Sequence, residues 1–152
     1  MSAVAAAGGL LVIDASLFVQ LIVEEPQTAS IARYLSEEHR TDRFIAPSIL
    51  ASETAAAITR KLRRREIGPQ SAREAFESLQ QALADGSFEL LPANDFLQPA
   101  FELSLKLHHS LHDCMYLAVA RIQRALLVTV DQTLAGKAQA AGVQSRLVRA
   151  DR

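Results

Sequence analysis

The sequence predicts an α/β fold, a three-layer α/β/α sandwich with a central parallel sheet. Short, continuous apolar runs, the pattern of strands that are buried on both faces, recur along the chain and are separated by segments of helical periodicity. This alternation is typical of βαβ units, whose right-handed crossovers place helices on both faces of a parallel sheet. Two of the apolar runs end at an acidic residue, where ligands of such sheets bind.

In the first half of the chain, residues 10–13 form a strand that ends at Asp14, and Ser16 is in position to cap the next helix. A second short strand is expected at 44–46, and Pro47 and Ser48 open a long helix after it. The remaining segments of this half are helices at 17–23 and 28–38, a charged loop at 39–43, and the basic end of the long helix at 60–66, closed by Gly68 and Pro69.

In the second half, apolar residues recur at spacings of three and four over residues 71–84, which predicts an amphipathic helix that Asp85 and Gly86 end. Leu126 to Val130 is the clearest strand pattern in the chain, and it ends at Asp131. The other expected elements are a strand at 88–91, a helix at 96–107, a turn at 108–110, a helix at 111–124, a helix at 134–141 and a final strand at 146–148.

Length and composition favour one domain over residues 1–152, with residues 1–8 as a flexible leader that lacks the basic start of a signal peptide. The formal net charge is −1, so any site for a polyanion must be local. Cys114 is the only cysteine, which excludes an intramolecular disulfide and fits a reducing cytoplasm. No run approaches the roughly 18 to 20 apolar residues of a membrane span, so no membrane association is expected.

Four acidic residues each have a structural explanation, and for any one of them alone that explanation is favoured. Asp14 and Asp131 follow strands and precede helices, so each can be an N-cap. Asp113 lies three residues after Ser110, in a capping-box pattern. Glu53 lies near the start of its helix, where the helix dipole favours negative charge.

The four acids together are harder to explain structurally. Glu53 and Asp113 lie in apolar, alanine-rich helical segments, where a carboxylate normally has a partner or a metal. Carboxylates that meet at one sheet edge repel each other unless a divalent cation binds between them, and all-oxygen ligation selects Mg²⁺ or Mn²⁺. Such an ion usually acts on phosphate esters, so the chemistry we expect is phosphodiester hydrolysis by an activated water.

Taken in order, the sequence motifs around these acids resemble those of the PIN-domain family, and within it the VapC-type toxins. The matching segments are LLVIDAS, APSILASETAAAI, HDCMYLAVA and LLVTVDQTL, and the resemblance extends over residues 10–142. By motif, Asp14, Glu53, Asp113 and Asp131 take the catalytic and metal-binding positions of the family. Ser16 and Thr129 take the small hydroxyl positions that support the same site.

The resemblance implies a magnesium-dependent endoribonuclease, the toxin of a type II toxin–antitoxin pair. It further implies an RNA substrate, a protein antitoxin that covers the site, and a homodimer. Gln20 stands where many relatives have Lys, which leaves the choice of RNA open. Apolar residues beyond one face in the helices around 49–62 and 72–83 suggest that the dimer forms through them.

A basic run lies at the end of the long helix: Arg60, Lys61, Arg63, Arg64 and Arg65. It can contact an RNA backbone or an antitoxin, or it can be a solvated helix end where cations favour the dipole. At about 1.5 Å per residue, Arg63 lies roughly 15 Å from Glu53 along the axis, too far to act at the metal.

His112 precedes Asp113 and can contact phosphate at the rim of the site, although an ordinary helix-start residue is the simpler explanation. The group of His108, His109 and His112 lacks the further ligands that a zinc site requires. Cys114 and Tyr116 are expected to pack in the core or behind the site.

Two other functions compete with the nuclease. The first is a catalytically silent scaffold, or a regulatory module that binds RNA or protein, which the presence of all four acids argues against. The second is a response regulator or an aspartyl phosphatase. That possibility is disfavoured because the first strand ends in D-A-S, without the second aspartate such sites require.

Overall fold

In the computed structural model, which describes residues 8–149, five parallel strands form one sheet in the order β3-β2-β1-β4-β5. Residues of β1 pair with β2 on one side and with β4 on the other. The strands are β1 (Leu10–Ile13), β2 (Arg43–Pro47), β3 (Phe88–Leu91), β4 (Leu126–Thr129) and β5 (Ser145–Leu147). The predicted parallel sheet is therefore confirmed.

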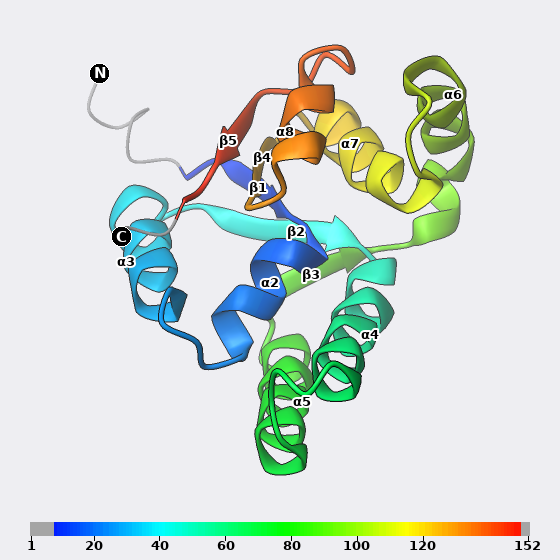
Figure 1. Cartoon of the computed structure of the whole chain (residues 1–152). Helices are drawn as coiled ribbons and strands as arrows, with labels where there is room; N and C mark the ends of the chain where they lie inside the picture. The colour runs from blue at the N-terminus through cyan, green and yellow to red at the C-terminus, as the bar shows by residue number, and fades with distance from the viewer. Residues whose placement is uncertain (1–7, 150–152) are drawn as a thin grey trace.

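Seven α-helices in the described residues cover the sheet on both faces (Figure 1). One face carries α2 (Ala15–Ile22), α3 (Thr28–Glu38), α4 (Ile49–Arg63) and α5 (Pro69–Ala84). The other face carries α6 (Leu97–Leu107), α7 (Leu111–Gln123) and α8 (Gln132–Ala138), and a short 3-10 helix, η1 (Ala93–Phe96), precedes α6. These three layers are the α/β/α sandwich that the sequence predicts.

The chain leaves β1 toward β2 on one side of the sheet and leaves β4 toward β5 on the other. The strand order therefore reverses between β1 and β4, and at such a point a crevice opens beyond the carboxyl ends of the strands. Asp14 follows β1 directly, and Asp131 lies two residues after the end of β4. The fold thus places two of the predicted site residues just beyond the ends of the two strands between which the order reverses.

Helix α7 forms the centre of the core on its face of the sheet. It packs against β1, β2 and β4, and its residues 114–120 are all buried. Because β1 and β4 are also almost fully buried, the start of α7 is fixed relative to the ends of both strands. Asp113 lies in this first turn and is held where the two strands end.

Several helix boundaries differ from the sequence-based expectation, and the capping residues explain most of the differences. Helix α2 begins at Ala15 because Asp14, and not Ser16, is its N-cap. Helix α4 ends at Arg63, before a turn in which Arg65 adopts a φ of 59°. Helix α5 begins two residues early, with Pro69 in the first turn, where its missing N–H costs nothing.

The last helix, α8, spans 132–138 where 134–141 was expected, because Asp131 caps it and a turn with Gly142 at a φ of 73° follows it. Strand β5 begins and ends one residue earlier than expected, and β4 ends one residue earlier. The 3-10 helix before α6 was not predicted from the sequence.

The expected leader at 1–8 lies outside the described residues except for Gly8. A Cβ built at Gly8 would lie 1.7 Å from the Thr41 carbonyl oxygen, so only glycine fits there. Among residues 8–149, no helix combines the length and the apolar character that crossing a bilayer requires.

Candidate active site

Asp14 lies at the carboxyl end of β1, where two hydroxyl groups and a backbone amide surround it. Its Oδ1 accepts a hydrogen bond from the Leu17 N–H at 3.3 Å, and its Oδ2 accepts one from the Ser16 hydroxyl at 2.7 Å. Ser16 Oγ also lies 3.3 Å from Thr129 Oγ1, so the ends of β1 and β4 are joined through this hydroxyl. Ser16 therefore positions Asp14 and does not cap α2.

The Asp14 carboxyl group is 4% exposed, and its protonation reflects this environment. Burial raises its pKa from 3.8 to about 6, against hydrogen bonds from Ser16, Leu17 and Thr129 that lower it. The negative charge of Asp131 raises the pKa further. A nearby cation would offset both the cost of burying the charged carboxylate and its repulsion by Asp131. Carboxyl groups perturbed in this way are common at functional sites.

Asp131 is the N-cap of α8, as its position after a strand suggests. Its Oδ1 accepts hydrogen bonds from the backbone N–H groups of Thr133 at 2.9 Å and Leu134 at 3.1 Å. Its own N–H donates to Thr129 Oγ1 at 2.9 Å. The fully buried Thr129 therefore contacts both Ser16 and Asp131 and fixes the two acidic strand ends relative to each other.

Glu53 comes from α4 and meets α7 through the phenol of Tyr116. The Tyr116 hydroxyl donates to Glu53 Oε1 at 2.6 Å, and Tyr116 is only 1% exposed. His112 Nδ1 lies 3.4 Å from Glu53 Oε2, and the His112 side chain is 64% exposed. His112 is thus exposed beside Glu53, at the start of α7.

Asp113 lies in the first turn of α7, where Ser110 caps the helix by accepting from the Asp113 N–H at 3.3 Å. The Asp113 Oδ2 lies 2.8 Å from His109 Nε2, an ion pair when the imidazole is protonated. No Lys or Arg among residues 8–149 forms a salt bridge with Asp113 or Glu53. Neither carboxylate is therefore compensated by a permanently charged side chain in the described part of the chain.

The electrostatics of Tyr116 show how close several of these acids are. Burial is the largest contribution to the raised pKa of Tyr116, and the charge of Glu53 and its hydrogen bond to the phenol raise this pKa further. The charges of Asp14 and Asp113 raise the pKa as well. Three acids from three separate segments thus act on one phenol, and Asp131 acts on Asp14.

The four acids fit a divalent cation by the chemistry of their donors, because Mg²⁺ and Mn²⁺ prefer carboxylate oxygens. In the part of the chain that is described, however, no three Asp, Glu, His or Cys side chains converge closely enough to hold one ion. Three of the four acids have hydrogen-bond partners elsewhere: Tyr116 contacts Glu53, His109 contacts Asp113, and backbone amides contact Asp131.

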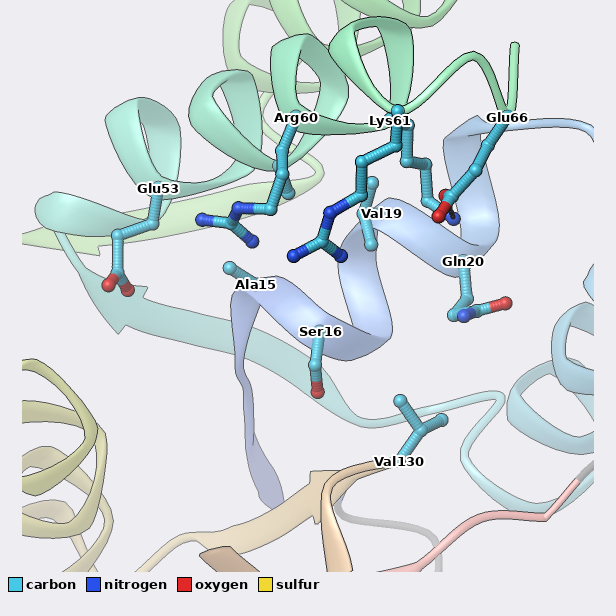
Figure 2. Close-up of a pocket in the computed structure, with 11 residues that line it drawn as sticks. Ala15, Ser16, Val19, Gln20, Glu53, Arg60, Lys61, Glu66 and Val130 are labelled. Atoms are coloured by element: carbon cyan, nitrogen blue, oxygen red, sulfur yellow. Dashed lines mark ion pairs between the residues drawn. The ribbon is translucent and has the colours of Figure 1, made fainter. Parts of the chain in front are cut away.

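A groove of about 300 Å³ runs along α2 and α4 and contains Glu53 (Figure 2). From α4 it is lined by residues at helical spacing: Glu53, Ala57, Arg60, Lys61 and Arg64. Lys61 forms salt bridges with Glu25 and Glu66, whereas Arg60 and Arg64 have no carboxylate within salt-bridge distance among residues 8–149. Arg63 is exposed on α4 but does not line this groove.

Tyr116 and His109 are the polar residues beside the site that the sequence left without a specific role. Tyr116 was expected only to pack, and His109 was considered only as a zinc ligand. A signal was present, because Tyr116 lies three residues after Asp113 on α7 and His109 lies four residues before it. The hydrogen bond from Tyr116 to Glu53 joins residues 63 apart in the chain, so the sequence could not reveal it.

The model of the PIN domain family matches residues 11–139. The chain belongs to the PIN domain family. The resemblance in the sequence motifs is thereby confirmed, and a PIN domain is the fold in which these acids lie. No curated protein matches the chain in sequence.

Solved structures with the same fold include VapC toxins. VapBC2 from Rickettsia felis, solved with a DNA fragment from their promoter, has a TM-score of 0.65 at 13% identity and covers 91% of this chain and 98% of its own. VapC20 from Mycobacterium tuberculosis, a sarcin-ricin loop cleaving toxin, has a TM-score of 0.63 at 18% identity with the same coverage. PAE2754 from Pyrobaculum aerophilum has a TM-score of 0.60 at 17% identity and covers 90% and 91%. At these identities the likeness concerns the PIN fold.

Proposed function

We propose that this PIN domain is a cytoplasmic, metal-dependent endoribonuclease that hydrolyses RNA phosphodiester bonds. One observation carries the proposal: Asp14, Asp113 and Asp131 come from three separate segments that meet at the carboxyl edge of the sheet, where Asp14 is buried beside the charge of Asp131. Structural caps would not require such a group at the strand-order reversal of the sheet, whereas a site for a divalent cation and a phosphate would.

Asp14, Glu53, Asp113 and Asp131 would hold Mg²⁺ or Mn²⁺ through carboxylate oxygens. When bound, the ion supplies an activated water and neutralises charge on the phosphoryl group. The roles of the neighbouring side chains follow from their contacts: Ser16 and Thr129 orient the strand-end acids, while Tyr116 orients Glu53. No covalent nucleophile is required for this hydrolysis.

Arg60 and Arg64 would contact the RNA backbone beside the acidic site. They line the groove with Glu53 and have no salt-bridge partner in the described residues, so their charge is available to phosphates. His112, at the rim beside Glu53, would add a hydrogen-bond donor to the same contact. Arg63 would take part only at the outer surface of α4, where an antitoxin can reach it.

We further propose that the nuclease is the toxin of a type II toxin–antitoxin pair. The support is the shared fold with VapBC2 and with the sarcin-ricin loop cleaving VapC20. An antitoxin would cover the groove and silence the site. A homodimer through α4 and α5 would fit the partly exposed Phe76 and the apolar groove between these helices.

The decisive experiment is RNA cleavage by the purified protein with Mg²⁺ or Mn²⁺. We expect cleavage by the parent, none with a chelator, and a loss of more than about a hundredfold in Asp14→Asn and Asp113→Asn, equal to about 3 kcal/mol of transition-state stabilisation or more. Asp85→Asn is the matched control, because this exposed acid lies before β3, at the opposite edge of the sheet. Equal cleavage by parent and site variants, or no cleavage by the parent with either metal, would refute the nuclease.

A further inference from the structure

We infer that a second groove, lined by glutamines beside the acidic site, binds the bases of the single-stranded RNA next to the cleaved phosphate. This inference rests on the proposed ribonuclease function. It assigns a binding subsite for nucleobases, chosen by their hydrogen-bonding edges, to residues that the metal and phosphate chemistry do not use.

The groove lies at the carboxyl edge of the sheet, between the ends of β4 and β5 and the helices α2 and α3. Its volume is about 590 Å³, within the roughly 300–1,000 Å³ of ligand sites in general. Its polar lining consists of Gln20, Gln27, Gln132 and Arg149. The remaining lining residues are aliphatic, so the walls combine apolar surface with amide groups, as sites for flat, polar ring systems do.

The second groove continues the first. Gln20 and Val130 line both, and Figure 2 shows these two residues at the end of the first groove opposite Glu53. An RNA strand that follows the first groove away from Glu53 would reach Gln20 and the glutamine-lined groove. The two grooves differ in what they offer: Arg60 and Arg64 present charge on one side, and amides line the other.

The charge of the lining also favours a nucleic acid over a cationic ligand. None of the residues that line the second groove in the described chain is acidic, although the adjoining site is built from carboxylates. Arg149 contributes the single formal charge of the lining, and it is positive. The described lining of the second groove therefore adds no negative charge of its own to that of the neighbouring acids.

Gln20 is held in place by its neighbours. Its Oε1 accepts a hydrogen bond from Gln27 Nε2, which also donates to Glu25 Oε2 at 2.8 Å. The Gln20 backbone carbonyl accepts from the Thr28 hydroxyl at 2.9 Å. With its carbonyl oxygen engaged, Gln20 keeps its amide N–H groups for a ligand, in an orientation that is set before binding.

Amides suit bases better than phosphates for a chemical reason. The carboxamide of Gln132 offers a donor and an acceptor side by side, which matches the paired donors and acceptors on a base edge, and the N–H groups of Gln20 add donors for base acceptors, whereas phosphate oxygens only accept. Single-stranded RNA exposes these edges because its bases are not paired. Gln132, exposed at the start of α8 beside Asp131, can reach a base that lies on Val130.

The test measures base preference as well as rate. Short RNAs that carry each of the four bases at the positions flanking one cut site are cleaved by the parent, by Gln20→Ala and by Gln132→Ala, and the kcat/KM ratios between bases are compared. We expect a preference in the parent that falls about tenfold in the variants, as the loss of one base-edge contact predicts. Cleavage of the RNA with the least favoured base should change much less.

Gln144→Ala is the control, because Gln144 is exposed before β5 at the amino edge of the sheet and contributes only its backbone carbonyl to the fold. Unchanged base ratios in both groove variants, or an equal loss of rate on all four bases, would overturn the inference while leaving the nuclease intact. If the parent cleaves no RNA, the proposed function itself fails. Thermal unfolding of each variant identifies any loss of rate caused by misfolding.

Discussion

At the amino edge of the sheet, Asp42 has a complete set of partners, whereas at the carboxyl edge Asp14 is buried beside a second carboxylate. Asp42 Oδ1 accepts from the Gly9 N–H at 2.6 Å, and Oδ2 accepts from His39 Nδ1 at 2.8 Å. The other ring nitrogen, Nε2, is hydrogen-bonded to the Tyr34 hydroxyl at 3.1 Å. These contacts join the starts of β1 and β2 to α3.

The carboxyl edge has the opposite electrostatic design. Asp14 also accepts two local hydrogen bonds, but burial and the charge of Asp131 raise its pKa to about 6. The charges of Glu53 and Asp113 also act in this region, where both raise the pKa of Tyr116. The comparison teaches that a lone carboxylate with its own hydrogen-bond donors stabilises the fold, whereas a carboxylate buried beside the charge of a second one indicates a site that favours a cation.

The largest expected effect is on the pH dependence of stability without metal. Because the folded state raises the Asp14 pKa from 3.8 to about 6, stability from this group is fully present below about pH 4 and is lost as pH rises to 6. The difference corresponds to about 3 kcal/mol. Urea unfolding with chelator should therefore show Asp14→Asn gaining about that much relative to the parent between pH 4 and pH 7.

Asparagine can keep the hydrogen bond from Leu17 but cannot ionise, so the comparison isolates the charge of Asp14. A parent and variant whose free energies of unfolding run parallel from pH 4 to pH 7 would show that the carboxyl group is not perturbed. In that case the contrast between the two edges would lose its electrostatic basis.

A smaller effect is expected from Asp42→Ala at the amino edge. This change removes two hydrogen bonds of a partly buried carboxylate, which should lower the free energy of unfolding by about 2 kcal/mol. The kcat for RNA cleavage should not change, since Asp42 lies at the opposite end of the strands from Asp14. A large loss of kcat in a folded Asp42→Ala protein would mean that the two edges do not have separate roles.

Much of this architecture could be predicted from the sequence because the relevant interactions are local. The apolar runs at β1 and β4 mark buried strands, and a parallel sheet then places Asp14 and Asp131 at one edge. Helix ends were less predictable, because Asp14 and Ser16 are both good caps and only the backbone conformation at Asp14 decides between them.

The links between the acids could not be predicted, because they are tertiary. Nothing local relates Tyr116 to Glu53, and the spacing of α4 residues alone does not show that Arg60 and Arg64 share a groove with Glu53 while Arg63 does not. Helical periodicity gives the relative directions of these side chains, but which direction faces the site depends on how α4 packs against α2. The separation between the acids also depends on their partners, which the motifs do not name.

The smallest expected effect is on Mn²⁺ affinity. It is tested by removing one phenol hydroxyl at each edge of the sheet. Tyr116→Phe deletes the donor to Glu53, and outer partners of metal ligands typically change metal affinity by about 10- to 100-fold. We expect Mn²⁺ binding, measured by calorimetry, to weaken about tenfold and saturating metal to restore most of the cleavage rate. Tyr34→Phe deletes the hydroxyl that is hydrogen-bonded to His39 and should leave Mn²⁺ affinity unchanged.

The recovery at high metal separates positioning from structure, because a protein that is merely destabilised would not regain its rate when metal is added to a folded sample. If Tyr116→Phe binds Mn²⁺ as the parent does, the hydrogen bond at 2.6 Å only satisfies a buried phenol, and Glu53 is oriented by α4 alone. If Tyr34→Phe weakens Mn²⁺ binding equally, the effect belongs to the whole sheet and not to its carboxyl edge. Only a loss confined to Tyr116→Phe supports a phenol that prepares Glu53 for the ion.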